Sequence, residues 1–180
     1  HFKNEIVHIQ SNDANIADDE GPREPDIDKI RSLNPVFDIE GTVTAATSSP
    51  VSIGGAMTLI VDGELAKLSD KDKFLIKSRA VAGVDWRTMG TGPLPATEKA
   101  LARAEMTIDD IDAIELNEAF AAQSLYVMRK GGWDQGKVNL NGGAIALGHP
   151  LGCSGARIIV TLMNILSQRD LSVGLATMCI

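Results

Sequence analysis

Apolar and polar positions form alternating blocks along this chain, and from about residue 50 onward these blocks predict strands separated by helices. Short apolar runs bounded by polar or turn-forming residues predict strands at 57–62, 74–81, 111–116, 138–140 and 173–180. Strands that alternate with helices are typical of a parallel sheet packed by helices. The sequence therefore predicts an α/β fold.

Three helices are predicted between these strands. Thr97 is expected to cap the first of them, because a threonine oxygen can accept a hydrogen bond from a free backbone N–H. A second helix is predicted over 118–130, where a pair of glycines ends it. A third, strongly apolar helix is predicted over 157–167.

Residues 1–50 have a different pattern. The stretch 13–28 is acidic and contains Pro22 and Pro25, which is typical of a surface excursion, and 27–33 predicts a short helix. We therefore expect a boundary near Pro50, with residues 1–50 and 51–180 as separate units. The chain begins without Met and stops in an apolar strand, so we expect a processed or partial product.

Composition limits the classes of function. Apolar residues make up 44% of the chain and charged residues 23%, as in ordinary globular proteins. A net charge of −7 argues against nucleic acid as the main partner, although a smaller polyanion could still bind to local basic groups. No apolar run is long enough for a membrane span, and the N-terminal residues do not resemble a secretory leader.

Two cysteines, Cys153 and Cys179, are too few and too far from the histidines for a metal site. We expect both to be reduced, in an intracellular protein. Cys153 is interpreted as a small packing residue at a helix start rather than as the nucleophile of a Cys–His pair. Arg157 is expected to form a local salt bridge or cap.

The richest candidate for chemistry is the glycine-dense run 139–157 around His149. Glycines let the backbone turn sharply and approach a ligand closely, and histidine transfers protons near neutral pH. A lone histidine in a tight turn is more often held by backbone groups. The density of glycines favours a loop that directs backbone N–H groups and an imidazole at one ligand.

Two further residues have a structural and a functional interpretation. Asn117 lies where a predicted strand meets a helix, so it either caps the helix or holds a water or an oxyanion at the sheet edge. Cys179 is either a buried apolar packing residue or a catalytic thiol. A catalytic thiol needs a base, for which His149 is the candidate.

Several motifs occur in an order that resembles the thiolase family over essentially the whole chain. They are 19–23, 41–45, 83–85, 89–93, 117–120, 142–157 and 174–179. The resemblance implies a thiolase-like fold of two similar βαβαβαββ halves, with a loop domain inserted in the first. Residues 1–50 match the end of the CoA-binding loop domain. Residues 51–180 match an incomplete second half, truncated after the strand that carries Cys179.

The resemblance also implies acyl transfer between 3-ketoacyl-CoA or acetyl-CoA and CoA, by thiolytic cleavage or Claisen condensation. His149 matches the histidine that activates a nucleophilic cysteine, Cys179 the second catalytic cysteine, and Asn117 the residue that fixes an oxyanion-hole water. CoA contacts are implied at Arg23, Phe37, Ser49, Met89, Ala119 and Phe120. CoA and acyl-CoA enter as substrates, with no covalently bound cofactor and no metal.

Three departures from the family pattern affect this expectation. The family's nucleophilic cysteine lies in the first half, which is absent here, and so is the glycine-rich segment that normally follows Cys179. Ile53-Gly54 replaces the usual Asp-Gly after the CoA-contacting serine. We therefore expect the chain alone to be inactive and the missing half to come from the parent or a partner chain. The assembly is expected to be a homodimer or homotetramer, cytoplasmic in a bacterium or in an organelle elsewhere.

The segments 151–153 and 178–179 favour a degradative 3-ketoacyl-CoA thiolase over a biosynthetic acetoacetyl-CoA thiolase, whereas 89–93 fits both. Condensing enzymes of the β-ketoacyl synthase type carry histidine or asparagine in place of Cys179, which disfavours them. A non-catalytic, thiolase-like protein that binds acyl-CoA or lipid is the alternative outside enzymes.

Overall fold

The computed structural model describes residues 1–180 and is organised around a short parallel sheet. Strands β3 (Ala113–Leu116) and β4 (Gly174–Thr177) pair with Leu116 opposite Thr177. All four residues of β3 are buried, as expected for a parallel strand covered on both faces. Val138 adds only one isolated bridge to Ile114, so the strand predicted at 138–140 does not form. The predictions at 111–116 and 173–180 are confirmed with shorter bounds.

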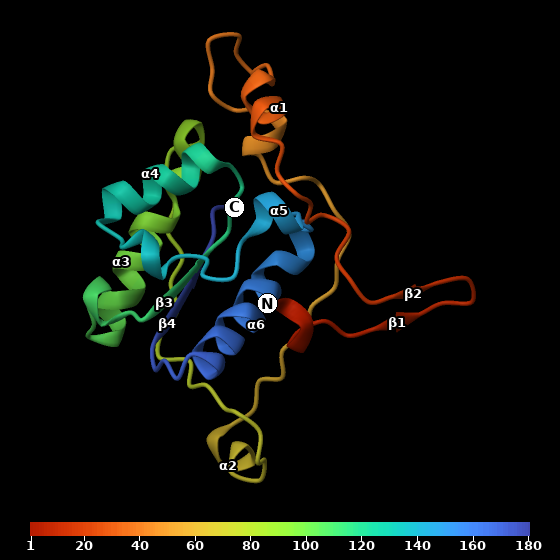
Figure 1. The fold of residues 1–180 in the computed structure, drawn as a ribbon. Coiled ribbons are helices and arrows are strands. Elements are labelled where there is room, and N and C mark those ends of the chain that lie inside the picture. The colour runs from red at the N-terminus through yellow and green to blue at the C-terminus, as the bar shows by residue number, and fades with distance from the viewer.

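Helices cover both faces of this sheet (Figure 1). Helix α6 (Leu151–Gln168) lies on one side, and α3 (Pro93–Ala104) and α4 (Ala121–Gly131) lie on the other. Side chains alternate between the faces of a strand. Ile114 and Leu116 pack with Val127 of α4, whereas Ala113 packs with Leu162 of α6. The central strand thus contributes to two apolar cores.

Two of the predicted helix starts are wrong. Helix α3 begins at Pro93, because proline lacks the N–H that would be unpaired at that position and its φ suits a helix start. Thr97 consequently lies buried inside the helix and does not cap it. Helix α6 begins at Leu151, six residues before the expected start. Its first turns contain glycines that sequence reasoning assigned to the loop.

The predicted helix over 118–130 corresponds to α4, which is capped at its C-terminus by Gly132 in the left-handed conformation. A short helix, α5 (Ala144–Leu147), was not expected. In the first part of the chain α1 (Ile27–Ser32) confirms the predicted short helix, and α2 (Gly63–Ala66) is added. Short 3-10 helices cover Phe2–Asn4, Ala45–Thr47, Trp86–Thr91, Ile108–Asp110 and Gln135–Lys137.

The strands predicted at 57–62 and 74–81 are absent. Leu59 is 88% exposed and Leu75 is 82% exposed. A strand needs a neighbour that pairs with its backbone N–H and C=O groups, and no segment of this chain pairs with either run. The strand predictions at 57–62 and 74–81 are therefore wrong.

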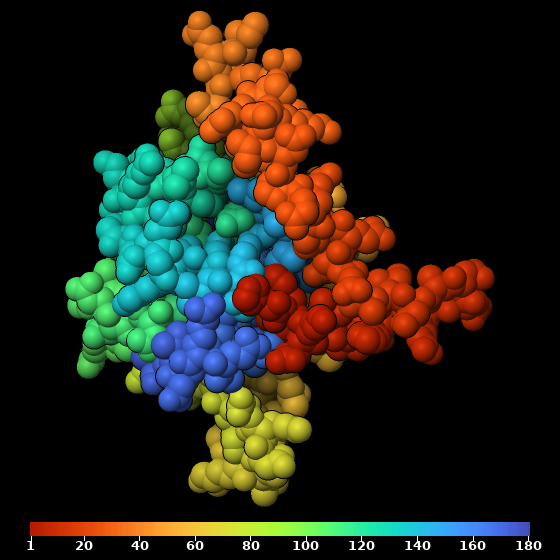
Figure 2. Space-filling model, viewed as in Figure 1, coloured from red at the N-terminus to blue at the C-terminus, as the bar shows by residue number.

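The first part of the chain projects from the rest. Strands β1 (Ile9–Gln10) and β2 (Asn15–Ile16) form an antiparallel hairpin that extends outward, and α2 lies at the end of another projection (Figures 1 and 2). None of the helices is both long and apolar enough to cross a membrane.

Candidate functional site

The candidate site lies at the carboxyl ends of the two parallel strands. Asn117 directly follows β3, and its backbone N–H donates to the carbonyl of Thr177 at 3.0 Å. Cys179 stands two residues beyond the end of β4. Both residues are buried, with exposed fractions of 0% and 8%. Ligands bind at this edge in many α/β folds, because loops there can converge on one point.

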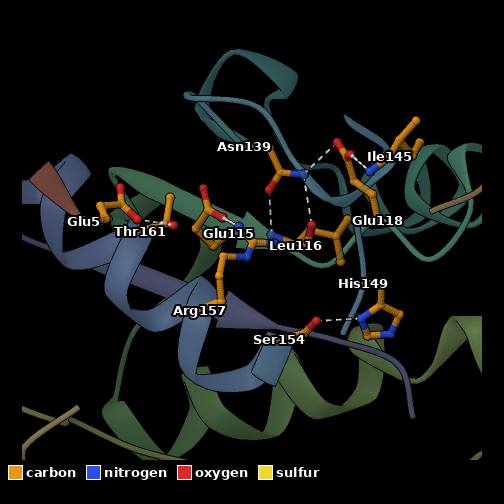
Figure 3. Close-up of polar contacts among 10 residues, drawn as sticks. All are labelled: Glu5, Glu115, Leu116, Glu118, Asn139, Ile145, His149, Ser154, Arg157 and Thr161. Atoms are coloured by element: carbon orange, nitrogen blue, oxygen red, sulfur yellow. Dashed lines mark hydrogen bonds and ion pairs between the residues drawn. The ribbon is translucent and has the colours of Figure 1, made fainter. Parts of the chain in front are cut away.

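The side chain of Asn139 ties the glycine-rich loop to the end of β3 (Figure 3). Its Oδ1 accepts from the backbone N–H of Leu116 at 2.8 Å. Its Nδ2 donates to the Leu116 carbonyl at 2.9 Å and to Glu118 Oε1 at 3.0 Å. Asn139 itself has a φ of 49°, in the left-handed region that asparagine tolerates. The loop is therefore fixed against the residue that precedes Asn117.

Two close approaches explain why glycines stand in this loop. Glu118 Oε2 accepts from the backbone N–H of Ile145 at 3.1 Å, and a Cβ atom on Gly143 would overlap the Glu118 carboxyl group. Gly148 has a φ of 101°, and a Cβ atom there would overlap Ser52. The loop thereby places His149 at the sheet edge. The backbone N–H of His149 donates to the carbonyl of Pro50 at 2.9 Å.

The imidazole of His149 is held at both nitrogens. Its Nε2 lies 3.4 Å from Asn117 Nδ2, and its Nδ1 lies 2.6 Å from Ser154 Oγ in the first turn of α6. Burial lowers the pKa of His149 below its ordinary value, and the positive charge of Arg157 lowers it further. The ring is therefore neutral at pH 7 and able to accept a proton.

Asn117 does not cap the helix that follows it, because the N-cap of α4 is Phe120. Its Oδ1 is buried without a hydrogen-bond partner, which is rare for a polar atom in a folded protein. An amide oxygen without a partner fits the other interpretation, in which the Asn117 amide holds a water or an oxyanion at the sheet edge.

Neither cysteine is hydrogen-bonded to His149. Burial raises the pKa of the Cys179 thiol, and its backbone N–H only partly offsets this. Burial likewise raises the pKa of Cys153, whose sulfur lies beside Gly54. Both thiols are therefore protonated at neutral pH, and Cys153 is a packing residue at the start of α6, as predicted.

Cys179 and Met89 both line a cavity of about 590 Å³ between residues 80–89, α6 and the end of β4. Of its 17 lining residues, 13 are hydrophobic, so it offers almost no partner for a phosphate. His149 and Asn117 are not among these residues, so the imidazole does not line this cavity.

Four of the six expected CoA-contacting residues meet beside Asn117. Ser49 donates from its backbone N–H and its hydroxyl to the carbonyl of Ala119, at 3.1 and 3.2 Å. The rings of Phe37 and Phe120 pack edge to face at 6.2 Å. Met89 lies in a 3-10 helix that packs on α4 and is half exposed. Arg23 is exposed and forms neither a hydrogen bond nor a salt bridge.

Arg157 contacts a buried acidic residue, Glu115, behind the site. The sequence predicted a salt bridge for Arg157 but not this partner. Arg157 Nη1 lies 3.3 Å from Glu115 Oε2, so the predicted salt bridge is confirmed, but its partner is 42 residues away rather than local. Burial raises the pKa of Glu115 to about 8, against the opposing effect of Arg157, so the contact is an ion pair only above about that pH and a hydrogen bond to the protonated carboxyl below it. The alternation of side chains between the two faces of β3 could have predicted this contact, because it places Glu115 on the face that α6 covers.

Comparison with known protein families covers almost the whole chain. Residues 71–180 match the family described as "Thiolase, C-terminal domain", and residues 1–64 match "Thiolase, N-terminal domain". The chain is 53% identical to the 3-ketoacyl-CoA thiolase of Acinetobacter baylyi over 99% of its own length and 48% of that protein. The corresponding values for the protein of the same name from Shewanella loihica are 53%, 99% and 49%. The chain thus spans about half the length of these relatives.

Solved structures confirm the fold. The Bacillus anthracis acetyl-CoA acetyltransferase matches with a TM-score of 0.90 and 39% identity, over 97% of this chain and 45% of that one. Human mitochondrial 3-ketoacyl-CoA thiolase in complex with CoA matches with a TM-score of 0.79 and 36% identity, over 93% and 43%. The predicted thiolase-like α/β fold is thus confirmed, and the chain belongs to the thiolase family.

Proposed function

We propose that these residues form part of a degradative 3-ketoacyl-CoA thiolase, which transfers acyl groups between 3-ketoacyl-CoA and CoA. Relatives with that name are 53% identical over nearly the whole chain. Residues 1–50 are proposed to end a CoA-binding loop domain, and residues 51–180 to belong to the second catalytic half. The proposed enzyme is an intracellular homodimer or homotetramer.

The observation that carries this proposal is the Asn117–His149 pair at the edge of the parallel sheet. A neutral imidazole accepts the proton of a cysteine thiol, and the resulting thiolate attacks the thioester or ketone carbonyl. The same ring, once protonated, faces the oxygen that becomes negatively charged, together with a water held by Asn117. Donors placed in advance at that oxygen stabilise the transition state more than the ground state.

Cys179 is suited to acid–base catalysis rather than to the role of nucleophile. Cys179 has a raised pKa and no hydrogen bond to His149, so it keeps its proton at neutral pH. A protonated thiol at the sheet edge is suited to giving a proton to the substrate's α-carbon during cleavage and taking it back during condensation. The attacking thiolate is therefore proposed to come from polypeptide outside residues 1–180, in the same parent protein or in a partner chain.

CoA is proposed to bind along the surface made by Phe37, Ser49, Ala119 and Phe120. The Phe37–Phe120 pair offers an aromatic edge for an adenine ring or a pantetheine arm, and the Ser49–Ala119 hydrogen bonds hold this surface next to Asn117. Met89 and Arg23 are proposed as further contacts, with Arg23 supplying positive charge for phosphates.

The proposal is tested by CoA-dependent cleavage of 3-ketoacyl-CoA. The purified chain alone is expected to give no turnover, whereas the chain joined to the N-terminal half of the Acinetobacter baylyi relative is expected to be active. In the joined protein His149→Ala is expected to lower kcat by a factor of about 100 or more. Cleavage by the chain alone, or an active His149→Ala variant, would contradict the proposal.

The biosynthetic alternative is favoured by the TM-score of 0.90 to an acetyl-CoA acetyltransferase. A panel of 3-ketoacyl-CoA substrates separates the two functions. The degradative enzyme is expected to cleave chains longer than acetoacetyl-CoA at least as well as acetoacetyl-CoA itself. A strict preference for the four-carbon substrate would favour the biosynthetic function.

A further inference from the structure

Ser154 forms a short side-chain contact with His149. It lies in the first turn of α6, is 1% exposed, and its Oγ is 2.6 Å from His149 Nδ1. The same hydroxyl donates to the carbonyl of Pro150 at 3.1 Å, and the Ser154 backbone N–H reaches that carbonyl at 3.0 Å. The serine is thus fixed on a helix and faces His149 Nδ1 (Figure 3), whereas Asn117 contacts the other ring nitrogen, Nε2.

A neutral imidazole carries one N–H, and the neighbours decide which nitrogen holds it. Asn117 presents its Nδ2 amide group, which only donates, to Nε2. Pro150 presents a carbonyl, which only accepts, to the Ser154 hydroxyl. If Nε2 is the acceptor, Nδ1 carries the proton and donates to Ser154 Oγ, whose own proton goes to Pro150. With this placement, each of the three contacts, from Asn117 to His149, from His149 to Ser154 and from Ser154 to Pro150, has one donor and one acceptor.

The opposite placement leaves a conflict. If Ser154 donated to Nδ1, the proton would sit on Nε2 and would face the amide N–H groups of Asn117, 3.4 Å away. Two donors would then face each other in a part-buried site, and one polar group would lose its hydrogen bond.

We propose that Ser154 is a positioning residue that holds His149 in the Nδ1–H tautomer and so leaves Nε2 free to accept a proton. The catalytic consequence rests on the proposed thiolase function, because Nε2 faces the sheet edge where the reaction is proposed to take place. The tautomer itself is a property of the folded chain and does not depend on any activity.

The test is the tautomeric state of His149 in the 15N-labelled chain of 180 residues, measured by long-range 1H–15N correlation above pH 7. The chain has three histidines, and His1 and His8 are exposed, so His149→Gln identifies the remaining signal. The wild-type ring is expected to be predominantly Nδ1–H. A ring that is predominantly Nε2–H in the wild-type chain overturns the proposal.

Three variants make the result specific to the hydroxyl. Ser154→Ala is expected to lower the ratio of Nδ1–H to Nε2–H by about fivefold, the effect of losing one hydrogen bond. Ser154→Thr keeps a hydroxyl and is expected to restore most of that ratio. Ser167→Ala, on the same helix but bonded to the exposed Asp72, is expected to change nothing. An unchanged ratio in a folded Ser154→Ala variant also overturns the proposal.

These outcomes remain separate from those of the proposed function. If the joined protein fails to cleave 3-ketoacyl-CoA but His149 is Nδ1–H, the positioning role stands and the assigned reaction fails. If the joined protein is active but His149 is Nε2–H, the reaction stands and the role of Ser154 fails.

Discussion

Residues 93–180 pack around a buried core, whereas residues 1–92 contribute no buried residue. All 24 buried residues lie in 93–180, and none lies in 1–92. Apolar runs occur in both regions, but they form strands with a core only at β3 and β4, where each finds a parallel partner. Helices α1 and α2 form in the first region even so, because a helix completes its hydrogen bonds within its own segment.

The largest effect expected from this comparison is on the free energy of unfolding, which should respond differently to the loss of a buried leucine and of an exposed leucine. Leu116→Ala removes a side chain that is 1% exposed in the core, and it is expected to lower the free energy of unfolding by about 2–5 kcal/mol. Leu59→Ala, at a side chain that is 88% exposed, is expected to change it by less than about 0.5 kcal/mol. Urea unfolding of both variants measures this. Equal losses would mean that residues 1–92 pack in solution.

The second effect is a pH dependence of stability from Glu115. Its folded pKa of about 8 is above the ordinary value of 4.5, so the folded state binds the extra proton between these pH values. The contribution of Glu115 to stability is therefore fully present below pH 4.5 and falls as the pH rises towards 8, by on the order of 5 kcal/mol. Glu115→Gln is expected to remove this slope from the unfolding free energy.

The matched control for this effect lies in the first region. Glu64 forms an exposed i,i+3 salt bridge with Lys67 on α2, and such pairs contribute little. Glu64→Gln is expected to leave the slope in place and to change stability by less than about 0.5 kcal/mol. If Glu115→Gln kept the wild-type slope, burial of Glu115 would not be its cause.

The smallest effect is on the titration of His149. Because burial lowers its pKa, the imidazole is expected to take up a proton only at a pH below its ordinary value of 6.5, as followed by NMR of the ring. The folded state then binds fewer protons than the unfolded state near that pH, so this residue's contribution to stability is lost as the pH falls. A midpoint at or above 6.5 would contradict a lowered pKa caused by partial burial of the ring.

The same comparison shows what the sequence can predict. Local patterns found α1, α4 and α6 and the two paired strands, and the motif order indicated that His149 and Asn117 belong to one site. The predictions of strands at 57–62 and 74–81 are wrong because a strand needs a pairing partner from elsewhere in the chain, which a local pattern does not reveal. Thr97 failed because Pro93, four residues earlier, already suits a helix start.

The parts of the site that sequence reasoning missed also depend on distant contacts. Arg157 pairs with Glu115 across the interface between α6 and β3, and Asn139 binds the backbone of β3 from 23 residues away. Ser154 stands five residues after His149, but its contact requires the helix to begin at Leu151, earlier than predicted. The first two contacts depend on how distant segments pack, and the third depends on where α6 begins.

The central claim is that His149 and Asn117 serve a nucleophile outside residues 1–180. The most direct measurement is the intact mass of the folded chain after incubation with acetyl-CoA, followed by peptide mapping of Cys153 and Cys179. No acetyl group is expected on either thiol, because burial keeps both protonated and neither is hydrogen-bonded to His149. Stoichiometric acetylation of either cysteine, lost in His149→Ala, would place the nucleophile within this chain and contradict the account.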